Sequence, residues 1–365
     1  MKIAFDYQIF TLQAYGGISR YFHQLGHEFT NRKHEVKIFA PYHCNQLIDL
    51  LGPSMVVGRR VSQGDFSKAK ALAIMLLNQM LAKRAINRWS PSLVHETYFA
   101  YRRSAPSKFP VVVTVYDMIH EKFPEYFGKL DPTSFLKKLA INRADQIICI
   151  SESTKKDLLE LFPWVEKKVS VIHLGFSAFS SKKVEPGTHK SYLLYVGSRN
   201  GHKNFRGLLA AYVSSKEIHS AFDLVAFGGG RFSAEETELI EEAGLGNRVK
   251  QVTGSDDLLA SFYKNAAAFI YPSFYEGFGL PPLEAMAQQC PVVSSNTSSM
   301  PEVVGDAGEL FDPYSVTEMR SAIERVIFSP TKRDWLVERG KARLAEFSWV
   351  KCAAQTEQVY RTALK

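Results

Sequence analysis

The sequence predicts an α/β protein built from two doubly wound, parallel-sheet domains. Short β-rich runs alternate with helical stretches along the chain, which is the pattern of strands joined by helical crossovers. The amino-acid composition changes around residues 175–190, where Ser, Lys, Pro and Gly replace the alternating apolar runs. At 365 residues the chain is long enough for two domains that each bury a core.

The expected strands form two series, one on each side of this change. The first series is Lys2–Asp6, Glu35–Ala40, Leu93–Glu96, Val111–Tyr116, Gln146–Ser151 and Val169–His173, and the second is Tyr192–Val196, Asp223–Phe227, Val249–Thr253, Ala268–Tyr271 and Pro291–Ser294. We therefore predict a first domain over 1–176, a linker over 177–190 and a second domain over 191–347. Ligands of such sheets bind outside the carboxyl ends of the strands, so functional residues are expected in the loops that follow strands.

Composition narrows the class of protein. The chain is 45% hydrophobic and 22% charged, as is typical of a soluble globular protein. Its apolar stretches fall short of the roughly 20 residues that a membrane-spanning helix needs. The N-terminus enters directly as a strand and lacks a secretory pattern, so we expect a cytoplasmic location. The four cysteines show no metal-binding spacing, which predicts reduced structural thiols.

The net charge of +8 is concentrated in the first half of the chain. Residues 1–175 hold 24 Lys and Arg against 15 Asp and Glu, whereas residues 176–365 hold 21 against 22. This basic half predicts a possible contact with an anionic membrane surface. Residues 66–89 form an apolar helical pattern with cations near both ends, which suits either such a contact or packing on the first sheet. Nucleic acid is disfavoured because no nucleic-acid-binding module is recognisable.

The most informative segment is the run 275–286, which contains two glutamates eight positions apart, Glu276 and Glu284. The apolar run 266–271 before it predicts a buried strand, and residues 282–289 predict a helix. Backbone N–H groups at the start of such a helix suit an anionic phosphate. The glycines of the intervening turn allow a ligand to approach the backbone closely, and both glutamates can face one pocket.

A second candidate loop follows the expected strand 192–196. It contains two cations, Arg199 and Lys203, which can stabilise negative charge on phosphate oxygens. The dehydrogenase alternative is disfavoured, because no spaced-glycine fingerprint with its acidic partner follows a strand. The phosphate-binding motif Gly-x4-Gly-Lys-Ser/Thr is also absent from the sequence.

The Glu-x7-Glu block, together with Tyr195-Val196-Gly197 and Lys203-Asn204, resembles the retaining glycosyltransferases of family 4. The resemblance extends over nearly the full chain. It implies the GT-B architecture, in which two Rossmann-like domains face each other across a cleft. It also implies that a final helix, 348–365, crosses back onto the first domain.

The resemblance also assigns roles to residues. Lys203 would bind the donor diphosphate, and Arg199 would supply the second charge because His202 stands where an arginine often precedes this lysine. Glu284 would bind the ribose hydroxyls and Glu276 the hydroxyls of the donor sugar. The other residues expected at the donor are Gly16, Gly17, Gly197, Ser198, Gly228, Thr253, Gly277, Phe278, Gly279 and Leu280.

In the first domain, the loop after the strand 111–116 carries the candidates for catalysis and for sugar or acceptor contacts. Tyr116 occupies the position where many relatives have a histidine that contacts the donor sugar, so that role does not transfer simply. Asp117 and His120 are the candidates, with helix capping or solvation as the alternative. His95 and Glu96 also end a strand, and they either line an acceptor pocket or have a structural role.

The predicted function is transfer of a hexose, with retention, from a GDP- or UDP-linked sugar to a glycan or lipid-linked saccharide. The expected setting is bacterial surface polysaccharide synthesis, in the cytoplasm or at the inner face of the membrane. The sequence shows no Asp-x-Asp metal motif in a suitable loop, which favours a mechanism without a metal or cofactor. A sugar-nucleotide epimerase of the same fold and a non-catalytic nucleotide-sugar-binding subunit stay open as alternatives. Glycoside hydrolysis also uses two carboxylates, but the cations indicate a phosphate-bearing leaving group.

Overall fold

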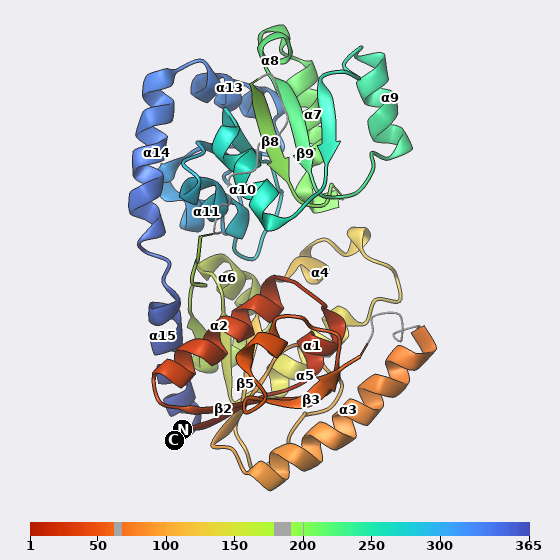
Figure 1. Cartoon of the computed structure of the whole chain (residues 1–365), viewed down its shortest axis with the longest axis vertical. Helices are drawn as coiled ribbons and strands as arrows, with labels where there is room; N and C mark the ends of the chain where they lie inside the picture. The colour runs from red at the N-terminus through yellow and green to blue at the C-terminus, as the bar shows by residue number, and fades with distance from the viewer. Residues whose placement is uncertain (62–67, 179–190, 200) are drawn as a thin grey trace. The chain divides into compact units, whose positions relative to one another are not determined.

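The computed structural model describes residues 1–61, 68–178, 191–199 and 201–365. Contacts within the chain divide it into two units, and Figure 1 labels many of their helices and strands. Unit 1 consists of Met1–Gly175 and Ser348–Lys365, and unit 2 consists of Phe176–Phe347. Most of the predicted linker, residues 179–190, lies outside the described residues.

Unit 1 contains a seven-stranded sheet in which neighbouring strands are parallel. The strand order is β3-β2-β1-β4-β5-β6-β7, so the order reverses between β1 and β4. The strands are β1 (Lys2–Phe5), β2 (Glu35–His43), β3 (Val56–Arg60), β4 (Leu93–Glu96), β5 (Val111–Val115), β6 (Gln146–Cys149) and β7 (Val169–Val171). Every residue of β4 and β5 is buried, as expected for strands at the centre of a parallel sheet that is covered on both faces.

The helices of unit 1 connect these strands and cover the sheet. They are α1 (Gln8–Leu12), α2 (Gly17–Asn31), α3 (Lys68–Trp89), α4 (Ile119–Lys122), α5 (Thr133–Arg143), α6 (Glu152–Leu161) and α15 (Trp349–Ala363), with 3-10 helices η1 (Ile48–Leu51), η3 (Pro124–Tyr126) and η4 (Pro163–Lys168). Both α2 and α3 pack against β2. The C-terminal helix α15 packs against α2, β5 and β6, and Figure 1 shows it beside α2.

Polar contacts fasten α15 to unit 1. The hydroxyl of Tyr360 lies 2.7 Å from Nδ1 of His95, and both side chains are buried. The carboxylate of Glu357 accepts a hydrogen bond from Nε of Arg32 at 2.9 Å and lies 3.3 Å from Nε2 of His34. The last residues of the chain are therefore part of the core that begins at residue 1.

Unit 2 contains a six-stranded sheet, also parallel throughout. Its order is β10-β9-β8-β11-β12-β13, which reverses between β8 and β11. The strands are β8 (Tyr192–Val196), β9 (Asp223–Phe227), β10 (Val249–Val252), β11 (Ala268–Tyr271), β12 (Val292–Ser295) and β13 (Gly308–Phe311). The helices are α7 (Phe205–Val213), α8 (Lys216–Ala221), α9 (Ala234–Glu242), α10 (Asp256–Asn265), α11 (Leu280–Ala287), α12 (Met300–Val304), α13 (Val316–Ile327) and α14 (Pro330–Leu344), with 3-10 helices η5 (Gly201–Lys203) and η6 (Gly305–Ala307).

The predicted fold class is confirmed, because each unit is a doubly wound parallel sheet with helices. Two strands were not predicted, β3 and β13, and each lies at an edge of its sheet. β3 contains a glycine and two arginines and is largely exposed, and β13 contains a glycine and a glutamate. Edge strands need no continuous apolar run because one side is unpaired and more accessible to water, so the pattern used to find strands is missing there.

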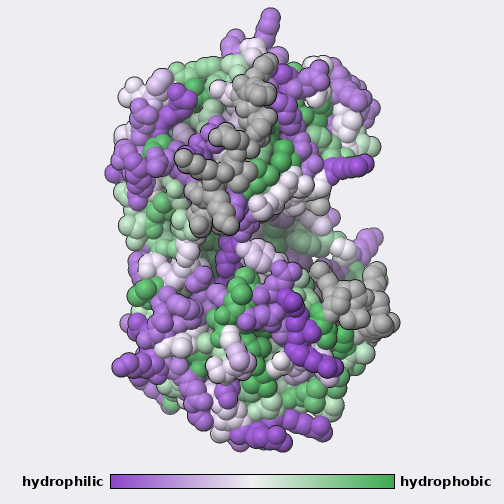
Figure 2. All heavy atoms as spheres, viewed as in Figure 1, coloured by the Kyte–Doolittle hydropathy of each residue, from purple (hydrophilic) through white to green (hydrophobic). Residues whose placement is uncertain are grey.

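The distribution of hydrophilic side chains over the surface and the burial of the cysteines are those of a folded globular chain. Figure 2 shows hydrophilic side chains over much of the viewed face of each unit, with apolar patches between them. Among the described residues, no helix combines the length and apolar character needed to cross a bilayer. All four cysteines are buried, unpaired thiols.

Candidate active site

The sheet of unit 2 brings two predicted site residues together at the point where its strand order reverses. η5 with Lys203 follows β8, and Glu276 lies in the loop after the neighbouring strand β11. Nζ of Lys203 donates hydrogen bonds to both carboxylate oxygens of Glu276, at 2.6 Å and 2.9 Å. The carboxyl ends of strands at such a reversal form the usual ligand-binding crevice of open α/β sheets. This pair is therefore the centre of the candidate site.

The backbone of Glu276 is held by two neighbouring serines. Its N–H donates to the hydroxyl of Ser298 at 2.9 Å, and the hydroxyl of Ser299 donates to its carbonyl oxygen at 2.9 Å. Ser299 also donates to the carbonyl oxygen of Phe278 at 2.7 Å. The loop that carries Glu276 is thus fastened to the segment before α12.

Asn204 orients the loop that carries Lys203. Its side chain caps α7 by accepting the N–H of Gly207 at 3.2 Å. Its side-chain amide also donates to the carbonyl oxygens of Pro272 and Pro313, at 3.1 Å and 2.9 Å. One buried amide therefore ties together the loops that follow β8, β11 and β13.

The ion pair is charged and partly shielded from water. The side chain of Lys203 is 22% exposed and that of Glu276 is 12% exposed. Burial alone would raise the pKa of Glu276, but the Lys203 ammonium and the hydroxyls of Ser273 and Tyr271 hold this pKa below its ordinary value. Glu276 is consequently ionised at neutral pH, and any anion that binds Lys203 competes with this carboxylate.

Glu284 lies on α11, directly after the same loop. The residue is 9% exposed, and its carboxylate accepts a hydrogen bond from the hydroxyl of Tyr263 at 3.2 Å. The helix begins after Gly279, whose φ of +115° favours glycine. A side-chain carbon at Gly279 would also lie 2.4 Å from Cε of Met300. The predicted strand, turn and helix are present, with the helix at 280–287 instead of 282–289.

The glycine loop after β9 packs against the loop after β8. Gly228–Gly230 have φ values of +89°, +70° and +73°, and Gly197 has a φ of +130°. A side-chain carbon at Gly229 would lie 2.9 Å from the carbonyl oxygen of Gly197. Thr253 follows β10, the next strand of the sheet, and is exposed. These predicted donor contacts therefore line the same edge of the sheet.

Arg199 is buried in contacts that the sequence did not reveal. Its side chain is 4% exposed, and Nε donates to Glu236 at 2.9 Å. Its terminal nitrogens donate to the carbonyl oxygens of Gly228, at 3.1 Å, and of Arg231, at 2.6 Å. The guanidinium also lies 4.8 Å from the ring centre of Phe232. Arg199 thus supports the glycine loop, and its role as a second cation for the diphosphate stays a prediction.

The remaining predicted donor contacts of unit 2 belong to the same two loops and to the start of α11. The carbonyl oxygen of Ser198 accepts a hydrogen bond from the hydroxyl of Tyr195. Phe278 is buried, with its ring edge-on to that of Phe347 at 5.6 Å. Gly277 precedes Phe278, and Leu280 is the first residue of α11.

In unit 1, Gly16 is the N-cap of α2 and Gly17 is its first residue, on the chain that leaves β1. The carbonyl oxygen of Gly16 accepts the N–H of Arg20 and the hydroxyl of Ser19, both at 3.0 Å, which closes the first turn of α2. A side-chain carbon at Gly16 would lie 2.4 Å from the side chain of Gln13. β1 lies beside the reversal in strand order of this sheet, and the contact of the two glycines with the donor stays a prediction.

Asp117 and Glu121, on either side of His120 in the sequence, bind a buried lysine that sequence reasoning missed. Nζ of Lys137, on α5, donates to the carbonyl oxygen of Asp117 at 2.9 Å and to the carboxylate of Glu121 at 2.7 Å. The side chain of Lys137 is 1% exposed. Burial and the charge of Lys137 lower the pKa of His120, whose ring stacks on Phe127 at 3.8 Å. The only sequence signal was a lysine within a helical pattern, which usually indicates a solvated face.

His95 and Glu96 lie in the core of unit 1, which favours the structural role among the two that the sequence left open. Besides Tyr360, His95 contacts the hydroxyl of Thr114 at 2.9 Å, and burial lowers its pKa to about 3. Glu96 forms a buried ion pair with Arg143 at 2.7 Å. Both residues end a strand, but in a sheet covered on both faces that position also serves internal packing.

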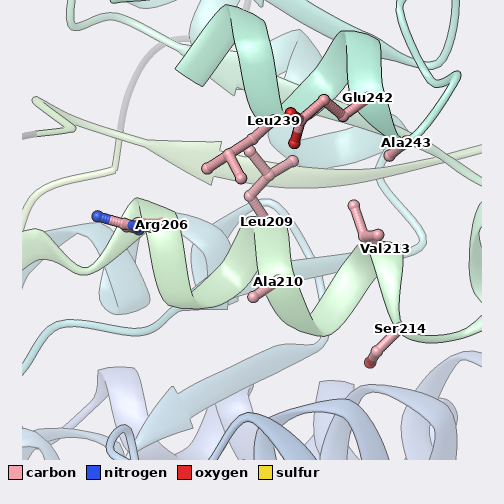
Figure 3. A pocket seen from close by; sticks show the side chains of 8 residues that line it. All are labelled: Arg206, Leu209, Ala210, Val213, Ser214, Leu239, Glu242 and Ala243. Carbon is pink, nitrogen blue, oxygen red and sulfur yellow. The ribbon is translucent and has the colours of Figure 1, made fainter. Parts of the chain in front are cut away.

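A hollow of about 520 Å³ lies elsewhere on unit 2, between α7 and α9 (Figure 3). Leu209 and Leu239 point toward each other across it, and Arg206 and Glu242 lie on its rim. None of the predicted site residues lines it. The polar groups suited to a nucleotide sugar are gathered at the carboxyl edge of the sheet instead.

Two doubly wound parallel sheets of this kind define the GT-B class of glycosyltransferases. Sucrose-phosphate synthase from Thermosynechococcus elongatus superimposes with a TM-score of 0.73 at 20% identity, over 99% of this chain and 98% of that chain. The HepE protein of Anabaena superimposes with a TM-score of 0.73 at 18% identity, over 99% and 100%. These likenesses show the fold.

Sequence comparison shows the family. The profile described as Glycosyltransferase Family 4 matches residues 15–178, and that described as Glycosyl transferases group 1 matches residues 177–343. O-antigen chain mannosyltransferase B of Escherichia coli is 32% identical over 266 residues, which cover 68% of this chain and 70% of that protein. MMP alpha-(1->4)-mannosyltransferase of Mycolicibacterium hassiacum is 29% identical over 236 residues, 63% of this chain and 57% of that protein. The chain belongs to the group 1, family 4 glycosyltransferases.

Proposed function

We propose that this glycosyltransferase moves a hexose, with retention and without a metal ion or cofactor, from a nucleotide-diphosphate sugar to a glycan or lipid-linked saccharide. The observation that carries the proposal is the Lys203–Glu276 pair at the strand reversal of unit 2, followed along the chain by Glu284. A cation, a carboxylate and a helix start are gathered at one sheet edge. These groups complement the phosphates and hydroxyls of a sugar nucleotide.

The ion pair suggests how donor binding prepares the site. When a diphosphate takes the ammonium of Lys203, the carboxylate of Glu276 is released to accept hydrogen bonds from hydroxyls of the donor sugar. Glu284 accepts the ribose hydroxyls. The acceptor oxygen then bonds to the anomeric carbon on the face from which the phosphate oxygen departs, and the acceptor proton passes to that phosphate. Lys203 stabilises the charge that grows on the leaving diphosphate.

The comparisons support a choice of substrates. The two relatives described above are named mannosyltransferases, one of them for O-antigen chains, and a structure of the Anabaena protein contains UDP and glucose. We therefore propose a GDP- or UDP-linked hexose as donor. A growing bacterial surface polysaccharide, handled on the cytoplasmic side, is the proposed acceptor.

The donor is tested by thermal shift with UDP, GDP, ADP and TDP, because a nucleotide that binds the folded state raises Tm. Transfer is then measured with the matching radiolabelled donor and a saccharide acceptor, with and without a chelator, and the product anomer is assigned by NMR. Lys203→Met should abolish transfer, and Lys216→Met, on the exposed start of α8, should not. Sugar-nucleotide turnover that needs no acceptor would indicate an epimerase. Nucleotide binding without any turnover would indicate a non-catalytic subunit.

We also propose that unit 1 binds anionic membranes reversibly through α3. Leu76, Leu77 and Met80 are exposed on this helix by 65%, 37% and 45%. Nearby Lys83 and Arg84 are also exposed, whereas the opposite face packs against β2. Each cation close to an anionic surface contributes about 1 kcal/mol, and salt weakens this attraction.

Co-sedimentation with vesicles tests the membrane proposal. We expect binding to phosphatidylglycerol vesicles at low salt, and its loss at high salt or with neutral vesicles. Changing Lys83 and Arg84 to Gln should reduce recovery, whereas changing Lys216 and Lys264 to Gln on unit 2 should not. Equal recovery of both variants with anionic vesicles would refute the role of α3.

A further inference from the structure

Unit 1 carries a second hollow, of about 430 Å³, where α5 meets the end of α6 and the start of η4. Its volume falls within the range of small-ligand pockets, about 300–1,000 Å³. It is lined by Glu121, Ser134, Phe135, Lys138, Leu161, Phe162 and Trp164.

Two aromatic side chains of this hollow are exposed and one of them is firmly oriented. Trp164 is 64% exposed and Phe135 is 55% exposed. The indole N–H of Trp164 donates to the side-chain oxygen of Asn142 at 3.1 Å, and its ring stands edge-on to that of Phe162 at 5.6 Å. Exposed apolar groups gathered in a hollow usually indicate binding. The hydrogen bond to Asn142 orients the indole, which therefore presents a flat apolar surface to an occupant of the hollow.

The polar lining selects among possible occupants. The carboxylate of Glu121 is paired with the buried ammonium of Lys137, so the ammonium of Lys138 and the hydroxyl of Ser134 are the polar groups that the wall offers to an occupant. A charged ammonium and a hydroxyl beside the aromatic rings disfavour an acyl chain, because an acyl chain has no groups to hydrogen-bond with them. A neutral sugar ring fits both features, because its C–H face packs on an aromatic ring and its hydroxyls find donors and acceptors at the edge.

The hollow adjoins the residues that we predict to contact sugar or acceptor. Glu121 directly follows His120 in α4, and its carboxylate binds Nζ of Lys137 at 2.7 Å. The same Nζ donates to the carbonyl oxygen of Asp117 at 2.9 Å. One buried lysine therefore joins the wall of the hollow to the loop after β5.

We infer that this hollow binds one or two sugar residues of the acceptor glycan, at a distance from the sugar that receives the hexose. The inference rests on the proposed function, which assigns a glycan acceptor to this enzyme. Trp164 and Phe135 supply the stacking surfaces, and Ser134 and Lys138 bind the hydroxyls. The site favours acceptors that are long enough to reach it.

Direct binding tests the site without relying on transfer. Mannotetraose and methyl α-mannoside are titrated by calorimetry and by tryptophan fluorescence into the Lys203→Met protein, alone and combined with Trp164→Ala or Phe135→Ala. Both aromatic residues are exposed, so their loss should leave Tm unchanged. Trp335→Ala, at the exposed Trp335 on α14 of unit 2, is the matched control. Each change in the hollow should weaken tetraose binding about fivefold, which corresponds to about 1 kcal/mol.

Kinetics on the active protein complete the test. Trp164→Ala should raise KM for the tetraose acceptor and leave its kcat and the KM for methyl α-mannoside unchanged. Equal tetraose affinity with and without Trp164 would overturn the inference, even if transfer is active. Saccharide binding that depends on Trp164 in a chain without any transfer would instead refute the proposed function and leave the sugar site standing. A Trp164 emission shift caused by phosphatidylglycerol vesicles and not by saccharide would show a membrane contact and also overturn the inference.

Discussion

Replacing Lys203 by methionine is expected to lower the stability of unit 2 in addition to stopping transfer. Methionine keeps most of the aliphatic stem of lysine, so the change removes the ammonium and little packing. It leaves the carboxylate of Glu276, which is 12% exposed, without its counter-charge. Removing one partner of a fully buried pair costs about 3–5 kcal/mol. Because Lys203 is 22% exposed and water reaches the pair, we expect the free energy of unfolding to fall by about 2 kcal/mol at neutral pH.

The effect should depend on pH in a defined direction. In the wild type the pKa of Glu276 is below its ordinary value of 4.5, so the pair stabilises the fold at neutral pH and the contribution is lost as pH falls through that lowered pKa. Without Lys203, burial raises the pKa of Glu276 and the protonated acid becomes the favoured form. The loss of Tm in Lys203→Met should therefore be larger at pH 7.5 than at pH 5. For a domain of this size, about 2 kcal/mol corresponds to roughly 4–8 °C.

A double-mutant cycle separates the pair from its surroundings. Glu276→Gln alone should cost less than Lys203→Met, because the ammonium left behind is the more exposed partner. The double variant should recover much of the stability that Lys203→Met loses, and it should remain inactive. Calorimetric Tm values of the wild type, the two single variants and the double variant, measured at both pH values, give the interaction energy between Lys203 and Glu276. Strict additivity of the two changes, or an unchanged Tm for Lys203→Met, would refute the reasoning.

Four further outcomes are expected. Glu284→Ala should chiefly weaken binding of the free nucleotide and Glu276→Ala chiefly that of the intact donor; equal calorimetric losses for both ligands would contradict this division. Gly279→Ala should destabilise unit 2 by about 1–3 kcal/mol and impair donor binding, since its φ is +115° and Met300 is in the way. Arg199→Ala should lower Tm even without ligand, because three hydrogen bonds to the glycine loop and α9 are lost; a wild-type Tm with reduced donor affinity would instead favour a direct phosphate contact. Glu357→Gln should lower Tm at pH 7, and the difference from the wild type should shrink as pH falls from about 4.5 towards 2. Burial raises the pKa of Glu357, but Arg361, Arg32 and His34 outweigh this effect and lower the pKa to about 2. A difference in Tm that does not change with pH would show that packing is responsible.

The central strands and the Glu-x7-Glu block at 275–286 were predictable because each is marked by a pattern of neighbouring residues. Apolar runs bounded by Gly and Pro predict the buried strands, and the turn before α11 placed Glu276 in a loop and Glu284 in a helix. The contact between Lys203 and Glu276 was not predictable from spacing, because it depends on β8 and β11 being neighbours although two other strands lie between them in sequence. The recognised family nevertheless assigned both residues to the donor.

Burial of charged groups was the feature that sequence reasoning handled least well. Arg199, Lys137 and Glu96 all occur beside polar residues in the sequence, which favoured accessible positions. Each is enclosed because a partner on another element neutralises it, as Glu236 on α9 does for Arg199 and Glu121 on α4 does for Lys137. Such pairing is a tertiary property, and the residues themselves give little local indication of it.

The path of the chain through unit 1 has a consequence for biosynthesis. Unit 2 is contiguous in sequence, so all of its strands are available once residue 347 has been translated. Unit 1 begins first, but α15 supplies the buried side chains of Tyr360 and Glu357 only after unit 2 has been translated. Unit 1 is therefore started before unit 2 and completed after it. Until then the surface against which α15 packs, including His95, is uncovered in the nascent protein, and exposed apolar surface of this kind favours aggregation.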